Sequence, residues 1–172
     1  PRKGGMHLLQ VAALLKQRYA FPFLITFVGK FDAESPYGKA LLAFRNSHDL
    51  EECVRFAGKV SQSELETSYR TADAFVLLSV NEHANYEGYP LVFHEAAMWG
   101  LPTIGTFDCG AEDAIKNGQT GVLVHPEDHA AVAAVVGDLQ SGALTIRPDE
   151  CRQWARDNDW GTKDLAGMYR FL

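Results

Sequence analysis

The chain has 172 residues, enough for one domain of ordinary size. Its hydrophobic share of 47% and charged share of 22% are typical of a soluble globular domain, and no apolar run approaches the roughly 18 residues of a membrane-spanning helix. A net charge of −6 argues against a nucleic-acid-binding protein, which needs a basic surface. Three widely separated cysteines form no metal-binding cluster, so we expect reduced thiols in an intracellular protein.

Helical and extended patterns alternate along the chain. We expect helices at 5–19, 37–44, 61–70, 90–100, 111–116, 128–140, 148–157 and 162–171, and strands at 23–28, 54–57, 74–80, 103–106 and 122–124. Ser61 and Glu64 form a capping box at the start of one helix, and Pro90 fits the first helical position of another. This alternation predicts an α/β fold, in which a parallel sheet is covered by helices on both faces.

Ligands of such sheets bind at the carboxyl ends of the strands, in the loops that lead to the next helix. Three loops are candidates, at 29–36, 58–61 and 81–90. The first lacks the G-x-G-x-x-G pattern, which disfavours a dinucleotide-binding dehydrogenase. Its Lys30 is placed to reach a phosphate, although an exposed loop lysine is an equally good interpretation.

The most informative segment is Glu87-Gly-Tyr-Pro-Leu-Val-Phe-His-Glu95, which joins the third loop to a helix. Glu95 lies a little over one turn inside that helix, roughly 7 Å along its axis. Four backbone amides near the helix start lack intrahelical acceptors and form a cradle for an anion, flanked by the two carboxylates. They belong to Gly88, Tyr89, Leu91 and Val92. The alternative is an ordinary helix start, in which Glu87 complements the dipole and Glu95 is solvated.

The stretch from Glu87 to Ile104 resembles the E-x7-E signature of glycosyltransferase family 4, whose members are retaining enzymes with the GT-B fold. Other matches follow the family's order. They are Arg2-Lys3-Gly4, Val54-x-Phe56-x-Gly58-x-Val60, Ala72-Asp73-x-Phe75-Val76-x-x-Ser79 and Gly118-x-Thr120-Gly121-x-Leu123-Val124-x-Pro126. The resemblance implies a Rossmann-like three-layer α/β/α domain, the C-terminal, donor-binding half of such an enzyme. Residues 1–172 would form one unit, with C-terminal helices at about 148–172.

The resemblance also implies roles for the residues that match. Glu95 would bind the ribose hydroxyls of a nucleotide, and Glu87, as a catalytic residue, would face the donor sugar. The amides from Gly88 to Val92 would hold the sugar and the diphosphate. The expected donor is therefore a sugar nucleotide of the UDP or GDP type.

A nucleoside diphosphate gathers negative charge as it leaves the sugar, so a basic residue and oriented amides can lower the barrier without a metal. By resemblance, Lys3 would neutralise the diphosphate in this catalytic step, with Arg2 beside it as a donor-binding residue. Val60 and its neighbours would contact the base, largely through the backbone. We expect no metal ion and no cofactor besides the sugar-nucleotide substrate.

This sequence departs from the family pattern at several places. Pro90 replaces the usual glycine and has no amide to donate. The loop at 81–86 is longer than the common version, which places His83 and Asn85 near the sugar pocket. Residues 109–112 replace the usual Gly-Gly-x-x-Glu. The chain also begins too late to include the family's upstream Gly-Arg pair and the strand before it.

The N-terminal acceptor domain, which supplies a histidine near the reacting sugar in this family, is absent from the chain. We therefore expect an excised or partial donor domain, inactive alone, from an enzyme that transfers a sugar to a glycan or lipid-linked acceptor. Its expected location is the cytoplasm, including the cytoplasmic face of the membrane. Two alternatives stay open: a GT-B-like sugar-nucleotide epimerase, and a non-catalytic nucleotide-binding or scaffold domain.

Two weaker metal signals have ordinary explanations. Asp157 and Asp159 match the D-x-D motif of another transferase fold, but they lie between late helices, where a solvated turn is the better interpretation. The six histidines show no third ligand at metal-binding spacing. The sequence thus predicts no metal site.

Overall fold

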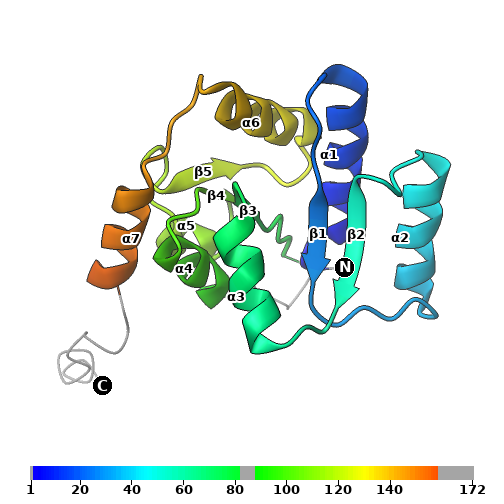
Figure 1. Cartoon of the computed structure of the whole chain (residues 1–172), viewed down its shortest axis with the longest axis horizontal. Helices are drawn as coiled ribbons and strands as arrows, with labels where there is room; N and C mark the ends of the chain where they lie inside the picture. The colour runs from blue at the N-terminus through cyan, green and yellow to red at the C-terminus, as the bar shows by residue number, and fades with distance from the viewer. Residues whose placement is uncertain (1, 82–87, 159–172) are drawn as a thin grey trace.

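The structure is a computed structural model that describes residues 2–81 and 88–158. Its helices are α1 (Gly5–Arg18), α2 (Pro36–Ser47), α3 (Gln62–Thr71), α4 (Leu91–Met98), α5 (Ala111–Ala114), α6 (His129–Ser141) and α7 (Pro148–Asp157). Its strands are β1 (Ile25–Val28), β2 (Val54–Gly58), β3 (Phe75–Val76), β4 (Thr103–Thr106) and β5 (Gly121–Val124). The alternation of strand and helix is confirmed (Figure 1). The helix predicted at 162–171 lies outside the described residues.

Side-chain caps explain where three of the helices begin. The Ser35 hydroxyl accepts a hydrogen bond from the amide of Gly38 at the start of α2. Ser61 and Glu64 form the predicted capping box of α3, and Asp128 caps α6. Each cap satisfies a backbone N–H that the helix itself leaves without an acceptor.

All the described strand pairs are parallel, as predicted, but they form two sheets. One sheet pairs β1 with β2, and the other has the order β3-β4-β5. The registers place Phe27 opposite Phe56 in the first sheet and Ile104 opposite Val122 in the second. Among the described strands, no ladder connects the two sheets.

Helix α1 packs against both sheets and so connects them (Figure 1). Its Val11 and Leu15 belong to the core formed with α6 over one face of β3–β5, where Ile104 is fully buried. Its Leu9 packs with Leu41 of α2 against β1 and β2. Helices α4 and α5 cover the opposite face of β3–β5, and α3 and α7 pack against α4. Strands β3–β5 thus lie between two layers of helices, as predicted, whereas β1 and β2 are covered on one face and leave Thr26 and Val28 exposed on the other.

Several element boundaries differ from the prediction. The apolar run at 74–80 contains only a two-residue strand. The last backbone hydrogen bond to β4 runs from the Leu77 amide to the Ile104 carbonyl at 3.0 Å, and the Val80 amide donates to the Arg2 carbonyl at 2.9 Å instead. Pro90 is not the first helical residue: it has the extended conformation of an N-cap, with φ −82° and ψ 99°, so α4 begins at Leu91. Helix α5 is shorter than predicted.

Candidate functional site

The N-terminal segment lies against the end of β3. Gly4 has φ +66°, a left-handed conformation, and a Cβ there would collide with the carbonyl group of Leu78. The Val80 amide donates to the carbonyl of Arg2 at 2.9 Å. This contact holds exposed Lys3 and half-buried Arg2 beside the residues that follow β3, at the carboxyl edge of its sheet.

The loop after β4 is tied to the same edge. The Thr106 hydroxyl donates to the Ser79 carbonyl at 2.7 Å, and both residues are buried. The side-chain amide of Asn81 donates to the Asp108 carbonyl, and Asp108 itself has a left-handed backbone, with φ 62°. These hydrogen bonds join the end of β4 to the segment that leads toward residue 88.

Gly110 brings this loop against the predicted anion cradle. A Cβ on Gly110 would lie 2.8 Å from the Tyr89 nitrogen and closer still to the Gly88 carbonyl. The φ of Gly110 is −61°, so this glycine is required by the close approach of two backbones and not by its own conformation. The departure from the family pattern at 109–112 therefore keeps a glycine where the Gly88–Tyr89 peptide packs.

The start of α4 differs from those of α2, α3 and α6. Pro90 provides no side-chain cap, although its carbonyl accepts from the Phe93 amide at 3.0 Å. Leu91 and Val92 are the first two residues of α4, so their amides have no acceptor within the helix. At this N-terminus the positive end of the helix dipole meets the carboxyl edge of the sheet, the arrangement that binds anions in other proteins.

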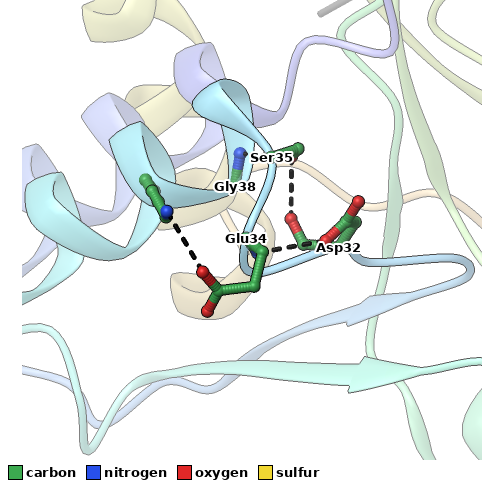
Figure 2. Close-up of polar contacts among 5 residues, drawn as sticks. Asp32, Glu34, Ser35 and Gly38 are labelled. Carbon is green, nitrogen blue, oxygen red and sulfur yellow. Dashed lines mark hydrogen bonds and ion pairs between the residues drawn. The ribbon is translucent and has the colours of Figure 1, made fainter.

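Figure 2 shows the contrasting loop after β1. The Ser35 hydroxyl donates to the Asp32 carbonyl at 2.7 Å, the Glu34 amide donates to the Asp32 carboxylate at 3.0 Å, and Glu34 pairs with Lys39 at 3.1 Å. Together with the bond from the Gly38 amide to the Ser35 hydroxyl, these contacts satisfy the donors at the start of α2 within the loop itself. Lys30 is exposed in this loop. Because the Glu34 and Gly38 amides already have acceptors, the loop is a poorer anion cradle than the start of α4.

The remaining predicted site residues are distributed as follows. Val60 is half-buried in the loop after β2. Among the described residues, no hydrogen bond or ion pair joins Val60 or Lys30 to residues 2–4 or 77–81. Glu87 lies outside the described residues, as do His83, Asn85 and Asp159. The structure thus gathers Arg2, Lys3 and the amides of Gly88, Tyr89, Leu91 and Val92 at one edge.

Glu95 is exposed on α4 and contacts a residue that the sequence did not single out. Its Oε2 accepts a hydrogen bond from the Tyr69 hydroxyl of α3 at 2.9 Å. Tyr69 is only 9% exposed, and it lines a groove between α3 and α4 together with Gln62 and Trp99. Burial and the neighbouring carboxylate raise the pKa of the Tyr69 hydroxyl, which therefore remains a donor at physiological pH. No sequence pattern links residues 26 positions apart on two helices.

Among residues 2–81 and 88–158, the other titratable groups do not gather into a metal site. In the described ranges, no three His, Cys, Asp or Glu side chains are placed to hold a metal ion. His7 and His129 do meet, with 2.9 Å between Nδ1 of the first and Nε2 of the second.

The described helices include none that is long and apolar enough to cross a membrane.

Comparison with known proteins identifies the family. The model of the family "Glycosyl transferases group 1" matches residues 1–157. The chain belongs to the group 1 glycosyltransferases. A relative in Mycolicibacterium smegmatis, the GDP-mannose-dependent alpha-(1-6)-phosphatidylinositol monomannoside mannosyltransferase, is 28% identical over 171 residues; the match covers 95% of this chain and 43% of the relative.

Solved structures share the fold of this group 1 domain. Anabaena HepE in complex with UDP-glucose aligns over 100% of this chain and 46% of its own, with a TM-score of 0.81 and 21% identity. The C-terminal domain of a group 1 glycosyltransferase from Francisella tularensis aligns over 99% of this chain and 82% of its own, with a TM-score of 0.69 and 21% identity. The expected Rossmann-like fold of a GT-B glycosyltransferase domain is thus confirmed. The chain spans less than half the length of the mannosyltransferase and of HepE.

Proposed function

We propose that this domain binds the sugar-nucleotide donor of a retaining family 4 glycosyltransferase. One observation carries the proposal: the uncapped N-terminus of α4 lies at the same sheet edge as the Arg2–Gly4 segment. An uncapped helix start and two basic residues suit a diphosphate, because both supply positive potential to its oxygens. Glu87 and Glu95 complete the E-x7-E motif, and Glu95 is assigned to the ribose hydroxyls.

In the proposed reaction the glycosidic bond to the diphosphate breaks as the bond to the acceptor oxygen forms, and the proton of the acceptor hydroxyl passes to the departing diphosphate. Negative charge then develops on the leaving diphosphate. The amides of Leu91 and Val92 are fixed at the start of α4 before the reaction, so they stabilise this charge without reorganising, and Lys3 and Arg2 add positive charge. Glu87 faces the donor sugar in this proposal. No resident metal is assigned a role.

The relatives support either base for the donor, since one is GDP-mannose-dependent and a solved structure holds UDP-glucose. The acceptor that we propose is a glycan or a lipid-linked glycan, bound mainly by a second, N-terminal domain. We place the enzyme in the cytoplasm or at the cytoplasmic membrane face, where the free cysteines Cys53, Cys109 and Cys151 stay reduced.

Calorimetry of the purified protein with UDP, GDP, and the corresponding nucleosides tests the binding role. Glu95→Ala should weaken nucleotide binding at least about tenfold, or ~1.4 kcal/mol, because the ribose hydroxyls lose their acceptor. Lys3→Ala should weaken binding of the diphosphates more than that of the nucleosides. Lys39→Ala is the matched control: it removes an equal charge from α2, where Lys39 pairs with Glu34. This variant should bind the nucleosides and the diphosphates as the wild type does.

Absence of nucleotide binding at millimolar concentration would favour the scaffold alternative and refute the donor-binding role. Equal losses for nucleoside and diphosphate in Lys3→Ala would contradict the assignment of Lys3. The epimerase alternative makes a different prediction for the whole enzyme: the sugar of a labelled donor would change configuration but stay attached to its nucleotide.

A further inference from the structure

The Tyr69–Glu95 contact fixes a surface carboxylate to a buried ring. Tyr69 is in the last turn of α3, where its ring packs with Ala96 and Leu101 in a small core. The ring centroid of Phe75 lies 6.2 Å from that of Tyr69, and Phe93 meets Phe75 edge-on at 5.5 Å. The phenol therefore has little freedom to turn, and its hydroxyl is delivered from a rigid position.

The hydrogen bond restricts Glu95 in a specific way. A glutamate side chain on an exposed helix face samples several rotamers, and ordering it on binding costs free energy. With Oε2 accepting from the Tyr69 hydroxyl at 2.9 Å, the carboxylate is restricted to the positions that keep this bond. Among the described residues, the Tyr69 hydroxyl is the only hydrogen-bond donor to this carboxylate, which leaves Oε1 with acceptor capacity for a ligand.

We propose that Tyr69 is a positioning residue that presets the Glu95 carboxylate for the ribose hydroxyls and thereby sets the preference of the site for ribonucleotides. The inference rests on the proposed function, because Glu95 must contact the ribose. Tyr69 itself touches no ligand in this arrangement. Its hydroxyl acts through Glu95, so its removal should change selectivity for the sugar of the nucleotide more than the stability of the fold.

The test compares UDP or GDP, whichever the wild-type protein binds, with the same diphosphate of the 2′-deoxynucleoside. Dissociation constants are measured by calorimetry for wild type, Glu95→Gln, Tyr69→Phe and Tyr19→Phe. Tyr69→Phe should weaken ribonucleotide binding about three- to tenfold and should shrink the preference over the deoxynucleotide toward that of Glu95→Gln. Tyr19→Phe removes a phenolic hydroxyl from the opposite helix layer and should leave both constants unchanged.

The outcomes separate this inference from the function on which it rests. If the wild-type protein binds no nucleotide, the proposed function fails first. If Glu95→Gln loses the ribonucleotide preference while Tyr69→Phe retains it, only the role of Tyr69 is overturned. Tighter ribonucleotide binding in Tyr69→Phe would also overturn it, because the hydroxyl would then compete with the ribose. An unchanged preference in Glu95→Gln would remove the basis of the inference. A thermal melt of each variant confirms that the constants refer to folded protein.

Discussion

Gly110→Ala should disturb the candidate site as well as the fold. The added methyl carbon would lie 2.8 Å from the Tyr89 nitrogen, whereas ordinary contact begins at 3.4 Å. The Gly88–Tyr89 peptide or the loop after β4 must therefore move by at least about 0.6 Å, and by more at the Gly88 carbonyl. Overpacking of this kind costs about 1–3 kcal/mol, and the shift falls on the backbone that precedes the α4 amides.

The assay pairs a denaturant melt with calorimetric titration of the nucleoside diphosphate. Gly110→Ala should lower the free energy of unfolding by about 1–3 kcal/mol and weaken diphosphate binding at least about tenfold. Gly142→Ala is the control: Gly142 has φ +79° at the end of α6, so alanine costs about 1 kcal/mol through backbone strain alone. That control should bind the diphosphate normally. Wild-type affinity in Gly110→Ala would refute the view that this contact positions the cradle.

Three other outcomes test the site, the pH response and the cysteines. Gly88→Ala should leave the melting temperature unchanged, because no described heavy atom lies within 4 Å of the added methyl, yet it should weaken diphosphate binding by occupying the cradle. Burial, and next the neighbouring His7, lower the pKa of His129, so the folded state favours the neutral ring. The preference for the neutral ring stabilises the fold above the unfolded pKa of about 6.5, and this contribution is lost as the pH falls through the lower folded pKa. Thermal melts from pH 8 to 5 should show the loss of stability, and His129→Gln should make that loss smaller. Burial raises the pKa of the Cys151 thiol to about 11, so alkylation at pH 8, followed by mass spectrometry, should be slow unless urea is added.

The order of elements could be predicted because it depends on local features that the sequence displays. The capping box at Ser61 and Glu64 and the periodicity of α1 are examples, and both are present in the structure. Strand length was harder. The apolar run at 74–80 indicates burial, and Leu78 and Ser79 are indeed buried, but burial does not specify which backbone partner is available. Beyond Leu77 the partner changes from β4 to the Arg2 segment, which ends the strand.

The site could be predicted only to the level of segments. Motif matches placed Lys3 and the amides after Gly88 on loops that the structure brings to one sheet edge. The contact of Gly110 with Tyr89 and the hydrogen bond from Tyr69 to Glu95 were missed. Both depend on how closely two elements approach in three dimensions, and neither residue type nor spacing encodes that distance.

The net charge of −6 is compatible with the proposed anion site because the attraction acts over a short range. At physiological salt, charges more than about 8 Å from a bound diphosphate are largely screened, whereas an adjacent helix N-terminus contributes roughly half a positive charge. The starts of α1 and α4 both lack a side-chain cap, and the α1 start carries Lys3 and Arg2. Few side-chain charges are thus involved, and much of the attraction comes from fixed amides. We therefore expect diphosphate affinity to fall only shallowly between 0.1 and 0.5 M salt; a steep fall would show instead that many basic side chains contribute to binding.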